Sequence, residues 1–279
     1  MEYLLIFLAT VFGLLIGSFL NVVALRFNTG RSLEGRSSCF SCGKKLSWYE
    51  LIPVFSWLVQ QGRCRSCHSK VSPHYFFGEL LTGITFGLIF ARALFFSSVD
   101  LLDPWYLVST GFLFVVFSIL IVIFLYDMRH KIIPDKLSLL FAVISFVSLF
   151  FFEMSPLGFL FTGFHIPILV NFLAGLVIPL PFVALWLISR GRWIGLGDPK
   201  LMVGMGWLLG MSFGISAVFM SFWIGTLFAI SIMIVNALFK KTLLRSGKKS
   251  IMKEELPFAP FLIIGTLVTV VFHINLFFF

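Results

Sequence analysis

Long apolar stretches separated by short polar segments dominate the chain. Most are about 20 residues long, which lets a helix cross about 30 Å of hydrocarbon. Eight stretches are predicted as membrane-spanning helices: 3–25, 76–96, 106–126, 137–152, 167–189, 200–213, 215–238 and 257–278. Only the Gly-containing turn from Gly210 to Gly214 separates the sixth from the seventh, so a count of seven stays open.

The basic residues gather in alternate loops of this pattern, with Arg92 as the one exception. The four basic segments are 26–75, 127–136, 190–200 and 240–255. The loops around Asp100 and Glu153 contain no Lys or Arg. Because Lys and Arg are enriched in cytoplasmic loops, we expect the four basic segments in the cytoplasm and both termini outside. Seven helices would break the alternation, so we favour eight.

The composition supports a membrane protein. Of 279 residues, 59% are hydrophobic and 12% are charged, and the mean hydropathy is +1.04. Soluble proteins carry roughly 25% charged residues, so disorder is excluded and an ordinary soluble fold is disfavoured. The net charge of +9 lies in loops, which favours a topological role over nucleic-acid binding. The first stretch has neither a basic start nor a convincing cleavage site, and we expect it to be retained.

We therefore predict an all-α polytopic membrane protein with three parts. These are a first transmembrane helix at 1–25, a small cytoplasmic loop at 26–75 and a helical membrane domain at 76–279. No internal repeat is evident.

All four cysteines lie in the cytoplasmic loop, as two C-x-x-C pairs: Cys39, Cys42, Cys64 and Cys67. Four thiolates in two such pairs suit tetrahedral structural zinc, and a cytoplasmic location disfavours disulfides. Redox chemistry and free thiols are the alternatives. His68 and His74 are expected to be bystanders.

Three aspartates lie at the cytoplasmic borders of predicted helices, where a carboxylate is costly. Asp127 ends an apolar run, so its charge opposes the helix dipole; the alternative is an ion pair with Arg129 or Lys131. Asp198, in Gly195-Leu-Gly197-Asp198-Pro199-Lys200, could be an N-cap, a catalytic group or both. Asp135 is expected to cap the fourth helix.

Two carboxylates brought to one membrane face point to aspartyl proteolysis. Close carboxylates share a proton, so one can activate water while the other polarises the scissile carbonyl. Serine and metal hydrolases are disfavoured, because the chain has no G-x-S-x-G and no H-E-x-x-H. The two glycines before Asp198 would allow a close backbone approach and positive φ.

In this context the chain resembles the type IV prepilin peptidases, which are GxGD aspartyl membrane proteases. Six segments carry the resemblance: Gly17-Ser-Phe-Leu-Asn-Val-Val, the paired C-x-x-C with Trp48-Tyr49-Glu50-Leu51-Ile52-Pro53 between them, Tyr75 with Glu79 to Gly83, Asp127 with Ile133-Pro134-Asp135, Gly195-x-Gly197-Asp198-x-Lys200, and Leu256-Pro-Phe-Ala-Pro260-Phe261. Ala259 stands where this family usually has Gly.

The resemblance implies that Asp127 and Asp198 are the catalytic pair, with Gly195, Gly197, Lys200 and Asp135 as supporting motif residues. It makes the cysteines the zinc loop of the bifunctional bacterial members. Such enzymes cut leaders from type IV prepilins and pseudopilins at the cytoplasmic face of the bacterial inner membrane. They then methylate the new N-terminal residue with S-adenosylmethionine.

The sequence identifies no cofactor pocket, although Glu50 and Glu79 are candidates to contact the substrate amine. Three other functions stay open: a peptidase without methylation, a transporter with Asp127 and Asp198 as ion sites, and a non-catalytic scaffold. Besides prepilin substrates and the lipid bilayer, no partner is predicted, and nucleic acid is not expected.

Overall fold

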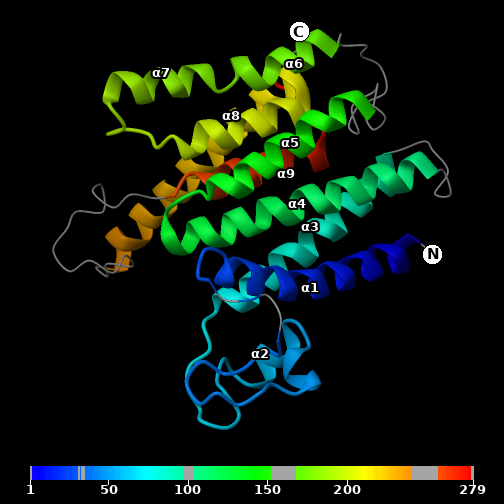
Figure 1. The fold of residues 1–279 in the computed structure, drawn as a ribbon, viewed down its shortest axis with the longest axis vertical. Coiled ribbons are helices and arrows are strands. Elements are labelled where there is room, and N and C mark those ends of the chain that lie inside the picture. The colour runs from blue at the N-terminus through cyan, green and yellow to red at the C-terminus, as the bar shows by residue number, and fades with distance from the viewer. Residues whose placement is uncertain are drawn as a thin grey trace. The chain divides into compact units, whose positions relative to one another are not determined.

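The computed structural model describes residues 2–30, 32, 35–96, 104–151, 168–239 and 257–277 (Figure 1). The loops around Asp100 and Glu153, the basic segment 240–255 and Leu256 of the last motif lie outside these residues.

Helices form nearly all of the described chain. They are α1 (Glu2–Arg26), α2 (Phe55–Val59), α3 (His74–Phe96), α4 (Pro104–His130), α5 (Asp135–Phe151), α6 (Ile168–Val177), α7 (Leu180–Ser189), α8 (Gly197–Phe239) and α9 (Ala259–Phe272), with a 3-10 helix, η1, at Trp48–Leu51. The all-helical prediction is thus confirmed for this part of the chain. Five helical stretches are long and apolar enough to cross a membrane: Glu2–Arg26, His74–Phe95, Leu107–His130, Leu169–Ser189 and Gly197–Val235.

Apolar side chains left uncovered by protein support the membrane assignment. On α1, seven large ones are at least half exposed: Tyr3, Leu4, Phe7, Leu8, Phe12, Leu15 and Phe19. In water such a surface would be unfavourable, whereas hydrocarbon covers it without cost. The chain is a multi-pass membrane protein.

Helix α8 contains a sharp break at the predicted turn. Gly210 has φ 76° and ψ −176°, which are not helical angles. A Cβ on Gly214 would lie only 3.6 Å from the Cα of Gly206, although eight residues of straight helix span about 12 Å. The chain therefore folds back at Gly210, and two arms, 197–209 and 211–239, correspond to the predicted sixth and seventh segments.

The predicted helix at 167–189 is interrupted. Helix α6 ends at Val177, and α7 begins at Leu180 with Pro179 as its N-cap. Pro179 and Pro181 lack the N–H that a continuous helix would need, so two prolines this close together break it. The predicted span at 167–189 is confirmed as a stretch able to cross a membrane, Leu169–Ser189, with this break inside it.

The chain forms two compact units, residues 1–126 and 127–279, and α4 runs from the first into the second. In the first unit α1 packs closely on α3. A Cβ on Gly13 would lie 2.8 Å from the Thr82 carbonyl oxygen, and a Cβ on Gly17 would lie 2.9 Å from the Thr82 side chain. Asn21 donates a hydrogen bond to the Tyr75 carbonyl at 2.9 Å. Small residues permit this approach, as is common between membrane helices.

In the second unit α8 packs against α5, α6 and α9 (Figure 1). Glycines again make the contacts close: a Cβ on Gly204 would lie 2.5 Å from the Phe141 ring, and one on Gly206 would lie 2.6 Å from the Ala174 carbonyl oxygen. Larger residues at these positions would separate α8 from α5 and α6. This packing fixes the start of α8 relative to α5.

Candidate active site and metal centre

Asp127 lies three residues before the end of α4 and is only 3% exposed. Two ion pairs join Lys44 to Glu50 and Lys200 to Asp135, and the Lys131 backbone N–H donates to the Asp127 carbonyl at 2.7 Å. A buried carboxylate at the negative end of a helix has no stabilising local role.

Asp198 is the second residue of α8 and is partly buried. The charge of Asp127 acts electrostatically on the Asp198 carboxyl, so the structure brings together two carboxylates that are 71 positions apart in the sequence. Pro199 follows in the first turn, where its missing N–H leaves no partner unsatisfied. Two neighbouring carboxylates in poorly hydrated surroundings can divide the roles of proton donor and proton acceptor toward one water molecule.

Gly197 has no side chain, and this lets the segment before α5 pack closely against the start of α8. A Cβ on Gly197 would lie 3.0 Å from Cβ of Ile133, which is tighter than ordinary packing. A Cβ on Gly195 would meet nothing closer than the Gly197 nitrogen at 4.0 Å. The close approach is thus confirmed at Gly197, but the positive φ expected for these glycines is absent from both.

Lys200 and Asp135 form a direct ion pair, with 2.6 Å between Nζ and Oδ1. Asp135 was expected as an N-cap, but it is the first residue of α5 and its carboxylate accepts a hydrogen bond from Lys200. No spacing rule could predict this pair, because 65 positions separate the partners. It links the two segments that carry the aspartates. Ala259, which stands where the resemblance leads us to expect Gly, begins α9 without positive φ.

We expect Asp135→Asn and Lys200→Gln to show a small, measurable coupling in stability. The side chains are 75% and 47% exposed, and exposed pairs contribute roughly 0–1 kcal/mol. A double-mutant cycle on thermal unfolding in detergent measures the coupling. A parallel cycle with Asp135→Asn and Lys136→Gln serves as the control and should be additive. Strict additivity in the Asp135–Lys200 cycle would contradict the pair.

The four cysteine sulfurs lie within 4.8 Å of one another. The two C-x-x-C pairs adopt the same turn: the Cys39 N–H donates to the Lys44 carbonyl, the Cys64 N–H donates to the Ser69 carbonyl, and both distances are 2.9 Å. Each turn passes through positive φ one residue after the second cysteine, at Gly43 (70°) and His68 (54°). The loop thereby converges four thiols on one point.

The donor set fits a tetrahedral metal ion. Zn–S bonds of about 2.3 Å place the sulfurs of a tetrahedron about 3.8 Å apart, and Cys39 and Cys67 sulfurs are separated by 3.8 Å. Backbone N–H groups of Cys42 and Ser41 lower the pKa of Cys39 to about 6. The Ser69 hydroxyl and backbone lower the pKa of Cys67.

Cys42 differs, because its pKa is raised to about 11. The Lys44 backbone N–H favours its thiolate, but burial and the neighbouring thiols of Cys67 and Cys39 outweigh that effect. Four adjacent thiolates would repel one another without a cation, so the cluster has the chemistry of a metal site.

Glu50 and Glu79, named as candidates for the substrate amine, are both engaged in shaping the loop. The Glu50 carboxylate accepts a hydrogen bond from the Ser47 N–H at 2.8 Å, and the Glu79 carboxylate accepts one from the Val54 N–H at 2.7 Å. Val54 has φ 63°, a strained angle for a β-branched residue. Glu79 therefore anchors a strained turn of the loop to α3, a role that sequence patterns do not reveal.

Two family models match the chain. The bacterial peptidase A24 N-terminal domain matches residues 11–93, and the type IV leader peptidase family matches residues 114–230. The first match contains all four cysteines, and the second contains both Asp127 and Asp198.

Curated relatives extend over most of the chain. A prepilin leader peptidase/N-methyltransferase of Vibrio cholerae is 30% identical over 227 residues, covering 76% of this chain and 81% of the relative. Proteins of the same name from Bacillus subtilis and Neisseria gonorrhoeae are 29% and 27% identical; they cover 92% and 80% of this chain, and the matches span 90% and 80% of those relatives. No solved structure is significantly similar to this chain.

Proposed function

Since this chain belongs to the type IV leader peptidase family, we propose that it is a bifunctional membrane enzyme acting on type IV prepilins or pseudopilins. It removes the leader peptide and methylates the new N-terminal residue. The names of the relatives support both activities. The structural observation that carries the peptidase half is that the segments of Asp127 and Asp198 meet: a Cβ on Gly197 would lie 3.0 Å from Ile133, Lys200 lies 2.6 Å from Asp135, and the two aspartate carboxyls interact electrostatically.

Asp127 and Asp198 are the catalytic pair in this proposal. One carboxylate, ionised, takes a proton from water, and the resulting hydroxide attacks the scissile carbonyl. The other, protonated, donates a hydrogen bond to that carbonyl and later a proton to the leaving amine. Gly197 and the Lys200–Asp135 pair hold the two aspartate segments together. Gly195 is assigned to the same motif.

Zinc is proposed as the metal of the four-cysteine loop, held by Cys39, Cys42, Cys64 and Cys67. A site closed by four protein ligands stabilises a loop and has no open position for catalysis.

The methyl donor is S-adenosylmethionine. The free amine of the cleaved substrate forms the N–CH3 bond as the S–CH3 bond breaks; the products are methylated pilin, S-adenosylhomocysteine and a proton.

The enzyme is assigned to the bacterial inner membrane, with eight spans, both termini outside and the active site facing the cytoplasm. The alternate placement of Lys and Arg along the chain supports this orientation. A prepilin presents a basic leader followed by an apolar helix, so its cleavage site lies at the membrane border. Asp127 and Asp198 are at helix ends, where such a site is reached.

A mass-spectrometric assay tests the proposal. The detergent-solubilised protein is incubated with a prepilin, with and without S-adenosylmethionine, and the new N-terminus is identified by mass. Leader loss plus one methyl group is expected with the donor, and leader loss alone without it. Cleavage that is never followed by methylation would leave a peptidase only. No cleavage by demonstrably folded protein would favour the transporter or scaffold alternatives.

A further inference from the structure

Residues 48–59 of the loop, which form η1, α2 and the turn between them, present a strip of exposed apolar side chains. Seven large ones are at least 40% exposed: Trp48, Tyr49, Leu51, Ile52, Phe55, Leu58 and Val59. We call these seven the apolar strip. The segment contains one charged residue, Glu50, which is only 7% exposed and accepts a hydrogen bond from the Ser47 N–H. A continuous apolar surface without charge is unfavourable in water and indicates a contact with something else.

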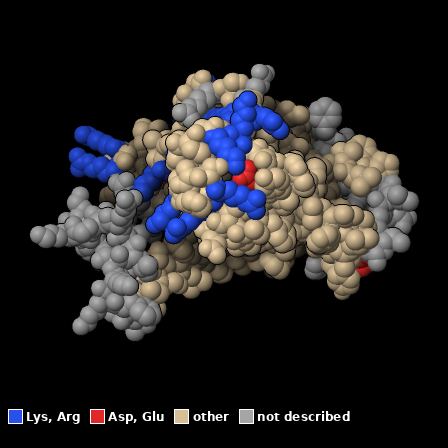
Figure 2. Space-filling model, turned by 90° about the horizontal axis from the view of Figure 1, so that it is seen from below, with Lys and Arg blue, Asp and Glu red and all other residues tan. Residues whose placement is uncertain are grey.

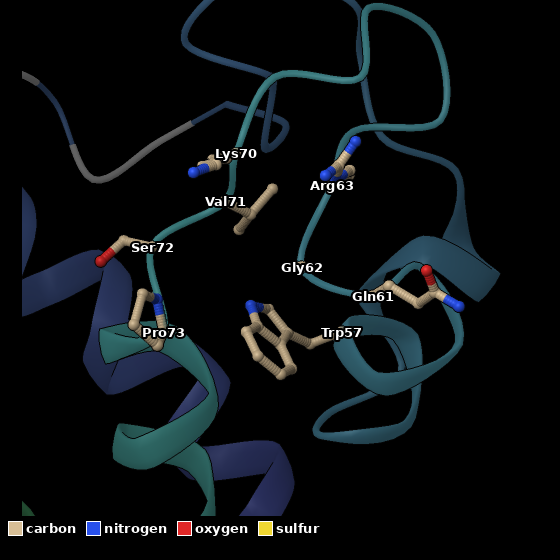
Figure 3. Close-up of a pocket in the computed structure, with 8 residues that line it drawn as sticks. All are labelled: Trp57, Gln61, Gly62, Arg63, Lys70, Val71, Ser72 and Pro73. Atoms are coloured by element: carbon tan, nitrogen blue, oxygen red, sulfur yellow. The ribbon is translucent and has the colours of Figure 1, made fainter.

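The packing of Trp57 fixes which side of α2 faces outward. Its ring lies 5.1 Å from that of Phe76 in α3, measured between centroids. Figure 3 shows the same ring pointing toward Pro73, at the approach to α3. Two positions along an α-helix correspond to a turn of about 200°, so Phe55 and Val59 point away from α3. Their side chains are 65% and 70% exposed.

A second contact with α3 sets the depth of the apolar strip relative to the bilayer. Helix α3 is long and apolar enough to cross a membrane from His74 to Phe95. The Val54 N–H donates to the Glu79 carboxylate at 2.7 Å, so Val54 lies beside a residue about 7.5 Å along the helix from His74. The headgroup region is about 5–8 Å deep on each side of the hydrocarbon. Val54 and the strip residues next to it are therefore held where headgroups meet hydrocarbon.

Basic side chains border the apolar strip. Four exposed ones flank it along the chain: Lys44, Lys45, Arg63 and Arg65. The Arg65 guanidinium lies 5.1 Å from the centroid of the Tyr49 ring. Figure 2, seen from the side of this loop, shows Lys and Arg side chains gathered on a surface with few acidic ones. Apolar and aromatic side chains bordered by cations are typical of protein surfaces that bind anionic bilayers.

We propose that the apolar strip inserts into the headgroup region of an anionic phospholipid bilayer, on the side where α1 ends and α3 begins. This part of the loop is then bound to the membrane without crossing it. Trp48 and Tyr49 suit such a border, because each ring is apolar and carries one polar N–H or O–H. Arg63 and Arg65 pair with lipid phosphates. The inference requires only that the chain spans a membrane, and it does not depend on the proposed enzymatic function.

Lipid is favoured over a protein partner because of where the strip is held. The contacts of Val54 and Trp57 with α3 are formed within the chain itself, so the strip is at the bilayer border before any partner arrives. Lipid is always present at that border. A prepilin or a second copy of the chain would have to displace it.

Photo-crosslinking of the full-length protein tests the assignment. Phe55→benzoylphenylalanine places a photoreactive ketone in the strip, and the protein is reconstituted into vesicles of phosphatidylcholine and phosphatidylglycerol. After irradiation, mass spectrometry of the intact protein identifies what is attached. The matched control is Phe40→benzoylphenylalanine, because Phe40 is 75% exposed in the same loop but lies outside the strip. We expect roughly tenfold more lipid adduct at position 55, the preference that burying one large apolar side chain gives.

The identity of the attached lipid tests the role of the cations. Adducts at position 55 should contain phosphatidylglycerol in excess of its share of the bilayer. Arg63→Gln should lower this excess roughly fivefold, the contribution of one basic residue near an anionic surface. Arg129→Gln removes an exposed cation outside the loop and should leave the excess unchanged.

Four outcomes would overturn the proposal. Equal lipid adducts at positions 55 and 40 would show that the strip has no preference for the bilayer. Adducts with a second copy of the chain would make it an oligomer interface. Adducts with added prepilin in place of lipid would make it a substrate-docking surface. Lipid adducts without excess phosphatidylglycerol would contradict the role of Arg63 and Arg65. Thermal unfolding in detergent shows that each variant is folded, and both crosslinker positions are exposed.

Discussion

Asp127→Asn and Asp198→Asn should each reduce the rate of leader cleavage by roughly 10³-fold or more. Asparagine preserves the shape of the side chain but can neither accept the proton of water nor donate one to the leaving amine, and such proton transfers contribute about 10²–10⁴-fold. The loss should fall on the chemical step. Initial rates of leader release, followed by mass spectrometry at saturating prepilin, measure it.

Three comparisons sharpen this result. Asp135→Asn is the same chemical change on an exposed carboxylate and should cost only a small factor, because it removes an ion pair worth roughly 0–1 kcal/mol. The Asp127→Asn/Asp198→Asn double variant should be about as slow as the slower single one, since residues acting as a unit are not additive. Methylation of a peptide that already has a mature N-terminus should persist. Near-wild-type cleavage by either single variant would exclude this pair.

Loss of one cysteine ligand should release the metal and unfold the loop. Cys64 is the most buried of the four, and we expect Cys64→Ser to abolish stoichiometric zinc binding and to lower the thermal unfolding temperature. Structural zinc sites contribute about 10–16 kcal/mol of apparent binding free energy in small peptides, so a four-thiolate site cannot lose a ligand at small cost. Two measurements check this result: the zinc content of the purified protein by elemental mass spectrometry, and the thermal unfolding of the protein in detergent.

Ser66→Ala is the matched control, because Ser66 lies between two ligands and is not one. It should keep about one zinc ion per chain. A wild-type protein that is folded and free of zinc, with all four thiols reactive, would return the cysteines to the redox or free-thiol alternatives.

The long apolar stretches of the sequence located the helices well, since a membrane-spanning helix must satisfy all of its backbone hydrogen bonds internally and be apolar along its length. Each of the eight predicted segments contains helix in the described structure. The breaks at Gly210 and Pro179 differ in how they could be recognised. The first was indicated by a glycine-rich turn, whereas the second interrupts a run whose hydropathy gives no sign of it.

The same distinction applies to the chemistry. The spacing of Cys39, Cys42, Cys64 and Cys67 was sufficient to predict a cluster, because short turns place both members of each pair on one side. The types and surroundings of Asp127 and Asp198 identified them as candidates, but the sequence could not show that their carboxylates interact. That proximity depends on how α8 packs against α5 through glycines.

By itself, therefore, the sequence determined the membrane class, the helical segments, the cysteine cluster and the residues most able to do acid–base chemistry. These properties follow from local composition and short spacing. Tertiary structure alone decided the Lys200–Asp135 pair and the anchoring of Val54 by Glu79. Each requires side chains from separate segments to meet, and such meetings depend on close packing that no short-range pattern encodes.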